Sequence, residues 1–323
     1  TICVTTPDNI CPDGPPLNDE PCNAVEVTLG SIASGNNACA TTSNEPAVVP
    51  SCWTTGTRNT VWYSFLAPAS GSVKIRTAPG TLLNTQIAAY SGTCGSSLTQ
   101  IASACNNDAP NCGGTTLTIS ELTLTGLTNG VRYYVSVDGT NNNVGSFAIT
   151  IVNGSAAYPS SSGQECSVPI TVCNTEINVG DPGYQGIGFT CDANSSIVNC
   201  TTGERGSAWY KIDISANGTL LFDIIPNDYD GTYGTETDYD FVLWKVTGSG
   251  STTCAAINSS GGDNEIACNF SADGVTGLSL DGNAPTEYPS FGSAYETGIT
   301  VIAGESYLLA VQKISVIVFQ VLH

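Results

Sequence analysis

The sequence predicts an all-β protein made of two tandem antiparallel β-sandwich domains, jelly-roll-like in type, with disulfide-stapled loops. Its apolar residues form short alternating runs rich in Val, Ile, Thr and Tyr, and no long stretch has helical spacing. One ordered set of motifs occurs twice along the chain. The 14 Cys divide into eight and six, so each half has an even number for its own bridges.

Charge and composition exclude several classes of function. Eight Lys and Arg against 28 Asp and Glu give a formal net charge of −20 over 323 residues. That charge excludes a general nucleic-acid binder and charge-driven docking on an anionic bilayer. The single His is His323, which disfavours histidine-based catalysis, and no nucleophile motif or phosphate-binding loop is present. We therefore expect a protein that is not an enzyme.

The cysteines indicate an oxidising compartment. Fourteen Cys, no Met and 11% charged residues are typical of secreted, disulfide-bonded chains. The longest apolar run, Ile314–Leu322, is far shorter than the ~20 residues of a spanning helix. We expect a secreted or extracellular protein, with no direct membrane insertion.

Short alternating runs predict the strands. Because side chains of a strand point alternately to its two faces, every second residue of these runs should face a core. The runs of the first half are Val61–Phe65, Val73–Ile75, Leu117–Ile119, Tyr133–Val137 and Phe147–Ile151. The residues expected to point inward are Tyr63, Phe65 and Ile75 in the first half and Tyr210, Ile212 and Phe222 in the second.

The repeat is anchored by two tryptophans. Trp62 precedes Gly71 by nine residues, and Trp209 precedes Gly218 by the same spacing. The further correspondences, in chain order, are Ile87–Tyr90 with Phe241–Trp244, Cys94 with Cys254, Cys105 with Cys268, and Gly130–Tyr133 with Gly304–Tyr307; upstream, Cys22, Cys39 and Cys52 correspond to Cys166, Cys191 and Cys200. This order predicts homologous domains at 17–154 and 164–323, a linker at 155–163, and a stapled leader at 1–16.

Disulfide pairing is predicted from sequence neighbours that both repeats retain. On that basis we expect Cys94–Cys105 and Cys254–Cys268, followed by Cys39–Cys52 and Cys191–Cys200. Elimination leaves Cys3–Cys11, Cys22–Cys112 and Cys166–Cys173, although spacing alone does not determine connectivity.

Several segments resemble the β-sandwich repeats of large Bacteroidota surface proteins exported by the type IX secretion system, including gliding-motility adhesins. The module is related to the pre-peptidase C-terminal domain and similar to CUB modules. The resemblance spans about residues 17–310 and implies a non-enzymatic, adhesive or structural role outside the cell. The segments that carry it are Leu17–Ala24, Val61–Phe65, Ile87–Gly95, Cys105–Asp108, Gly203–Tyr210, Asp238–Trp244 and Ala303–Tyr307.

Acidic loops make calcium the expected cofactor. Asp228 and Asp230 precede Asp238 and Asp240 within thirteen residues, and calcium takes six to eight oxygen ligands from such loops. The resemblance to pre-peptidase modules adds Asn18 and Asp19 ahead of the first strand, together with Asp108. A solvated acidic loop without metal is the alternative reading of the same residues.

The expected function is an adhesive or structural segment of a bacterial cell-surface adhesin or surface fibre. Its partners would be surface glycans, surface proteins or neighbouring copies of the chain. One alternative is a carbohydrate-binding module pair of a secreted hydrolase, although Trp62 and Trp209 at matched positions favour core residues over sugar-stacking ones. Another is a self-assembling filament subunit, in which the apolar strand Ile314–Leu322 would add to a neighbour's sheet.

Overall fold

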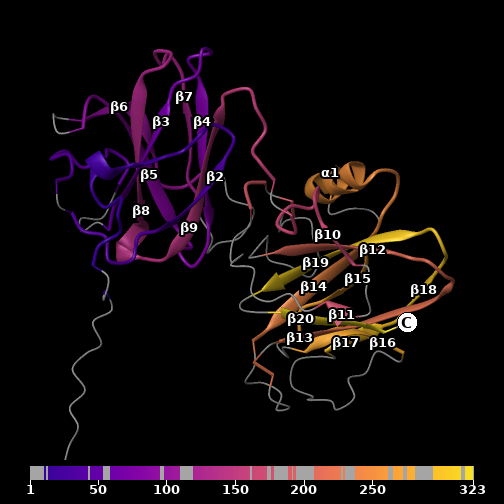
Figure 1. The fold of residues 1–323 in the computed structure, drawn as a ribbon. Coiled ribbons are helices and arrows are strands. Elements are labelled where there is room, and N and C mark those ends of the chain that lie inside the picture. The colour runs from indigo at the N-terminus through magenta and orange to yellow at the C-terminus, as the bar shows by residue number, and fades with distance from the viewer. Residues whose placement is uncertain are drawn as a thin grey trace, which may run out of the picture. The chain divides into compact units, whose positions relative to one another are not determined.

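The computed structural model describes most of the chain as two compact units, one up to Pro159 and one from Ser160 (Figure 1). The residues described are 11, 14–42, 44–53, 59–94, 98–109, 119–160, 162–172, 176–177, 188–190, 192–193, 207–226, 228–229, 237–260, 265–271, 275–280, 294–313 and 317–322. Within them, no helix has the length and hydropathy needed to cross a bilayer.

The first unit is a sandwich of a five-stranded and a four-stranded sheet, so the predicted all-β fold is confirmed. The first sheet has the order β1-β3-β8-β5-β6, and the second β2-β9-β4-β7. Their bounds are β1 Val25–Glu26, β3 Val61–Leu66, β8 Arg132–Gly139, β5 Thr85–Ser91, β6 Thr99–Asn106, β2 Ile32–Asn36, β9 Ser146–Asn153, β4 Val73–Pro79 and β7 Glu121–Leu124, with 3-10 turns η1 Pro21–Asn23 and η2 Thr140–Asn142.

The second unit repeats this topology. Its sheets have the orders β10-β12-β19-β14-β15 and β11-β20-β13-β16-β17, which reproduce the first unit strand for strand apart from the added β17. A further strand, β18, pairs with β13. The bounds are β10 Ile170–Val172, β12 Ala208–Asp213, β19 Ser306–Lys313, β14 Tyr239–Lys245, β15 Glu265–Asn269, β11 Glu176–Ile177, β20 Ile317–Leu322, β13 Gly218–Pro226, β16 Thr276–Ser279, β17 Tyr295–Thr297, β18 Ile299–Val301 and helix α1 Gly250–Ser260.

Most strand pairs are antiparallel, but each unit also has a parallel one. The short strand β1 runs parallel to β3, and β10 runs parallel to β12 in the same place. A third parallel pair, β16 with β17, belongs to the second unit alone among the described residues. The predicted antiparallel sandwich therefore holds for the main strands, and the parallel pairs are short additions of two or three residues at the sheet edges.

The two sheets of each unit enclose a core that the alternation predicted. Tyr63, Phe65 and Ile75 lie in the core of the first unit. Their counterparts in the second unit are equally buried in its core. Burial of these side chains between the sheets gives each unit the main part of its hydrophobic stabilisation.

A second apolar cluster covers the opposite face of the five-stranded sheet in each unit. We call it the outer cluster. In the first unit it contains Trp62, Trp53 and Tyr90, with Trp62 and Tyr90 ring centroids 5.1 Å apart. In the second unit Trp209 and Trp244 stack at 5.6 Å, and Ile257 of α1 packs on them. These tryptophans are at most 7% exposed, so they are core residues, as the matched positions favoured.

Three of the described disulfides attach covering segments to this outer face. The structure pairs Cys22 with Cys94 and Cys166 with Cys254, which are equivalent positions of the repeat. It also pairs Cys52 with Cys105 and Cys11 with Cys39, and Cys268 is disulfide-bonded as well.

The predicted pairings of sequence neighbours are therefore wrong wherever both cysteines are described. Cys94–Cys105, Cys254–Cys268 and Cys39–Cys52 do not form. Cys11, Cys22 and Cys166 pair with other cysteines, while their expected partners Cys3, Cys112 and Cys173 lie outside the described residues. The hairpin β5–β6 is already held by its backbone ladder, so its cysteines instead fix separate segments onto the sheet. Cys191–Cys200 lies outside the described residues.

The terminal apolar strand has a place inside its own unit. β20 lies between β11 and β13, with backbone partners on both sides. β13 pairs with the whole strand, and β11 pairs with Phe319 and Gln320 on the other side, so β20 already has partners within its own unit. This weakens the case for strand addition to a neighbouring copy.

Candidate functional site

The outer face differs between the units, and the difference opens a pocket in the first. In the second unit, α1 lies between β14 and β15 and buries Ile257 against Trp244. In the first unit the corresponding link, residues 92–98, is too short for a helix of that length. A pocket of about 920 Å³ lies beside Tyr90 there, bordered by the segments Glu20–Asn23 and Asn44–Val48 and by the start of β6.

The pocket combines acidic and amide groups with an apolar wall. Of the described side chains that line it, Glu20 and Glu45 are acidic and none is Lys, Arg or His. Pro21, Pro46, Val48 and Leu98 supply the apolar part, and the amides come from Asn23, Asn44 and Gln100. Sequence reasoning missed this pocket, because its walls come from segments about 80 residues apart along the chain.

The Asn18–Asp19 pair, predicted to bind calcium, is occupied by protein donors. Asn18 Nδ2 donates to the Trp62 carbonyl at 3.0 Å, and the Trp62 N–H donates to the Asn18 carbonyl at 2.8 Å. Asp19 is buried, and its two carboxylate oxygens accept from the Thr41 N–H at 2.5 Å and the Thr41 hydroxyl at 2.6 Å. Here the residues hold the entering segment on β3 and do not fit an open metal site.

The acidic loop of the second unit is partly assembled. The Asp228 carboxylate accepts from the N–H of Thr237 at 3.0 Å and from its hydroxyl at 2.8 Å, and Thr237 directly precedes Asp238 in the sequence. Asp240 lies on β14 opposite Gln312 of β19. Asp230 lies outside the described residues.

Asp108 of the first unit is exposed, and its carbonyl accepts from the Asn106 amide at 3.3 Å. Among the described residues, no three Asp, Glu, Cys or His side chains gather into one metal-binding group.

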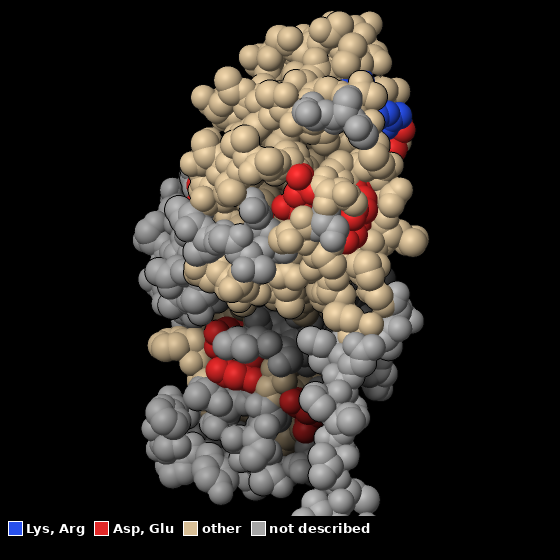
Figure 2. Space-filling model, turned by 90° about the vertical axis from the view of Figure 1, so that its left-hand side faces the viewer, with Lys and Arg blue, Asp and Glu red and all other residues tan. Residues whose placement is uncertain are grey.

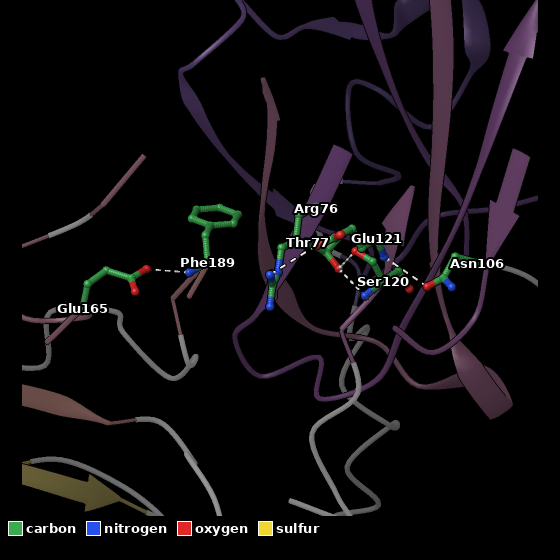
Figure 3. Close-up of polar contacts among 7 residues, drawn as sticks. All are labelled: Arg76, Thr77, Asn106, Ser120, Glu121, Glu165 and Phe189. Atoms are coloured by element: carbon green, nitrogen blue, oxygen red, sulfur yellow. Dashed lines mark hydrogen bonds and ion pairs between the residues drawn. The ribbon is translucent and has the colours of Figure 1, made fainter. Parts of the chain in front are cut away.

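A buried carboxyl pair, Glu165 and Asp192, was not singled out from the sequence. Glu165 is fully buried and accepts from the Phe189 N–H at 2.6 Å, as Figure 3 shows. Asp192 accepts from the Cys166 N–H at 2.6 Å. Gly188 is required beside them, because its φ is +66° and a Cβ there would lie 2.3 Å from the Glu165 Oε1 atom.

The environment of this pair favours the protonated form. Burial, followed by repulsion from Asp192, raises the pKa of Glu165 to about 8, and burial raises that of Asp192 to about 6. Glu165 Oε2 is buried with no hydrogen-bond partner. Two adjoining carboxyls with an unsatisfied oxygen can hold a shared proton or a hard cation, so this pair fits calcium better than Asn18 and Asp19. The sequence does contain a signal that could have indicated this pair. Glu165 directly precedes Cys166 and Asp192 directly follows Cys191, and both cysteines have counterparts in the first repeat.

One polar pair is exchanged between the repeats. Gln86 and Asp138 lie opposite each other on β5 and β8. The equivalent positions on β14 and β19 carry Asp240 and Gln312, the same two residue types on opposite strands. Asp138 is buried, and its carboxylate accepts from the N–H groups of Asn59 and Gly139 and from the Gln86 amide.

The fold defines a pair of disulfide-bonded β-sandwich units, each with an outer cluster on its five-stranded sheet. Two solved structures are similar to it. One is the pre-peptidase C-terminal domain of a collagenase from Bacillus anthracis, 11% identical over 40% of this chain and 93% of that one, with a TM-score of 0.26. The other is the CUB1-EGF-CUB2 region of human MASP-1/3, 8% identical over 90% of this chain and 99% of that one, with a TM-score of 0.17. No family model and no curated protein matches the chain.

Proposed function

We propose that the chain is a non-enzymatic adhesive or structural segment of a secreted cell-surface protein, of the kind exported by the type IX system in gliding Bacteroidota. The observation that carries the proposal is the repeated module itself. Two units of one topology share the equivalent bridges Cys22–Cys94 and Cys166–Cys254. Disulfides persist in oxidising compartments, and tandem stapled modules suit an extended extracellular protein.

The two alternatives have less support from the described residues. A carbohydrate-binding pair needs exposed aromatic faces, whereas Trp62, Trp209 and Trp244 are buried. A filament formed by strand addition needs β20 to pair with a neighbouring copy, whereas β20 pairs along its length with β13 and at two residues with β11 of its own unit. An adhesive or structural role requires neither an exposed aromatic face nor an open edge at β20.

Calcium is part of the proposal as a stabilising ligand of the second unit. Its candidate ligands are the Asp228–Asp238–Asp240 loop and the Glu165–Asp192 pair. Support comes from the buried Glu165 Oε2 atom, which has no hydrogen-bond partner, and from the bond between Asp228 and Thr237, the residue that precedes Asp238. A bound dication would hold these carboxyls ionised and offset part of the net charge of −20.

The test is adhesion of the intact chain. Beads coated with the oxidised protein should be retained under flow on cells or on extracellular protein layers, and beads coated with albumin should not. Incubation with small chromogenic esters, glycosides and peptides should give no turnover. Failure of the beads to adhere, or turnover of any substrate, would contradict the proposal.

A further inference from the structure

We propose that the pocket on the outer face of the first unit receives a basic side chain, Arg or Lys, presented by a partner protein. The inference deepens the proposed function and rests on it in one respect, that the partner is the adhesive one. It begins from the comparison of the two units. The second unit closes this face with α1, whereas the first leaves Tyr90 and Leu98 bordering an open pocket.

Charge selects the ligand. Glu20 and Glu45 line the pocket from its two bordering segments, and among the described residues no basic side chain lines it. Figure 2 shows the β6 side of the first unit, where red acidic residues lie among tan ones and a blue patch at the upper right has red beside it. An anionic ligand would be repelled here, whereas a guanidinium or ammonium group would be attracted by both carboxylates and steered by the net charge of −20.

The apolar wall of the pocket suits the aliphatic part of an Arg or Lys side chain. Leu98, Pro21 and Pro46 line the pocket together with the Cys22–Cys94 bridge. Arg and Lys bury their methylene stems on apolar surface while the charged end reaches polar groups. The amides of Asn23, Asn44 and Gln100 supply further acceptors for the remaining N–H groups.

The rim indicates a protein as the source of the side chain. Val48 borders the pocket and is 75% exposed, and the adjacent Val49 is 40% exposed. An exposed apolar rim around a charged pocket is typical of a protein interface and gives a free amino acid little to contact. A sugar ring finds no open aromatic face, because Tyr90 is 2% exposed and packs against Trp62.

The experiment is calorimetric titration of the intact, oxidised chain in 0.15 M salt, roughly physiological ionic strength. The probe is acetyl-Gly-Val-Arg-Val-Gly-amide, with the same peptide carrying Lys, Gln or Glu in place of Arg. The Arg peptide should bind at least about tenfold more tightly than the Gln peptide, since its charge-assisted hydrogen bonds are lost in the latter. The Glu peptide should not bind.

Three variants that each remove one negative charge distinguish binding in the pocket from general attraction of the peptide by the acidic protein. Glu20→Gln and Glu45→Gln should each weaken the Arg peptide about fivefold to tenfold. Glu26→Gln removes the same charge on β1, where Glu26 pairs with Arg132 at 2.7 Å outside the pocket, and should leave binding unchanged. Unaltered melting temperatures confirm that the variants are folded.

Equal weakening by all three variants, or equal binding of the Arg and Gln peptides, would overturn the inference. The inference would also fail if neutral oligosaccharides bound more tightly than the Arg peptide and if Glu20→Gln and Glu45→Gln left that binding unchanged.

Bead adhesion then distinguishes the two proposals. If unaltered beads do not adhere, the proposed function fails while the titration still decides the pocket. If beads carrying Glu20→Gln and Glu45→Gln adhere as well as unaltered ones, the function stands and the pocket is not its contact.

Discussion

The two units share a topology but differ in the segments that cover the outer face of the five-stranded sheet. In the second, α1 seals Trp244 and the acidic pair Glu165–Asp192 is enclosed beside it. In the first, the equivalent link is short, Tyr90 borders a pocket, and Asp19 has both carboxylate oxygens satisfied by Thr41. The comparison indicates that the sandwich is the constant part of the module, and that the covering segments are where its two copies have taken on different chemistry.

The largest expected effect tests whether the equivalent bridges contribute equally. Replacing both cysteines of Cys166–Cys254 or of Cys22–Cys94 should lower the unfolding free energy of that unit by about 4 kcal/mol, because similar loops are closed. The loops span 88 and 72 residues, respectively. Calorimetry of the two variants should move one transition each. A shift of both transitions by either variant would contradict independent units, and peptide mapping that recovers Cys94 joined to Cys105 would contradict the pairing.

The second prediction concerns the closed and open faces. Ile257→Ala should destabilise the second unit by about 3 kcal/mol, because Ile257 is fully buried under α1 and leaves a cavity. Leu98→Ala in the first unit should cost under about 1 kcal/mol, since Leu98 borders an open pocket that the smaller residue merely widens. Urea unfolding measures both. Equal costs would mean that the pocket is closed in solution.

Calcium should act on the second unit alone. At a hundredfold excess over its Kd, an ion that binds only the folded state adds about 2.7 kcal/mol. We expect a higher melting temperature of the second transition in calcium than in chelator, with magnesium at equal ionic strength as the control. Glu165→Gln tests the buried pair and Asp238→Asn tests the loop. An equal shift in magnesium would indicate screening of the acidic surface and contradict the site.

The exchanged Gln–Asp pair sharpens the comparison further. Asp138→Asn should cost the first unit about 2 kcal/mol, because charge-assisted bonds from the Asn59 and Gly139 N–H groups become neutral ones. Asp240→Asn in the second unit should cost less, since Asp240 is partly exposed. The double change Gln86→Asp with Asp138→Gln, which copies the second unit, should recover part of the loss. Chemical denaturation checks all three, and no recovery would mean that the exchange is coincidental.

The smallest effect is on pH dependence. The pKa of Glu165 and that of Asp192 are raised above their unfolded values, to about 8 and about 6. The folded state therefore binds more protons between about pH 4 and 8, and its stability falls as pH rises through that window. For one proton the slope is at most about 1.4 kcal/mol per pH unit. Glu165→Gln should flatten the slope in metal-free buffer, and a rising stability over this range would contradict the assignment.

Sequence reasoning reached the repeat and its core, because both depend on local patterns. The spacing from Trp62 to Gly71 matches that from Trp209 to Gly218, and alternation alone placed Tyr63 and Tyr210 inward. Features that depend on distant segments were missed.

Pairing Cys94 with Cys105 followed their closeness in sequence, whereas Cys94 joins Cys22 on a covering segment far from it in the chain. Alternation showed that Trp62 points away from Tyr63, but not that other segments bury it. Glu165 and Asp192 meet only because two loops converge, which no local spacing reveals.

The equivalent bridges also set how the chain would respond to tension. A pull on the two ends cannot lengthen the segment enclosed by a disulfide, because the force passes through the sulfur atoms. At about 3.4 Å per extended residue, Cys22–Cys94 withholds roughly 240 Å of contour length and Cys166–Cys254 roughly 300 Å. A tether built from such units would stay short even after its sheets have come apart. Refolding would then start from segments whose ends the disulfides have kept close together.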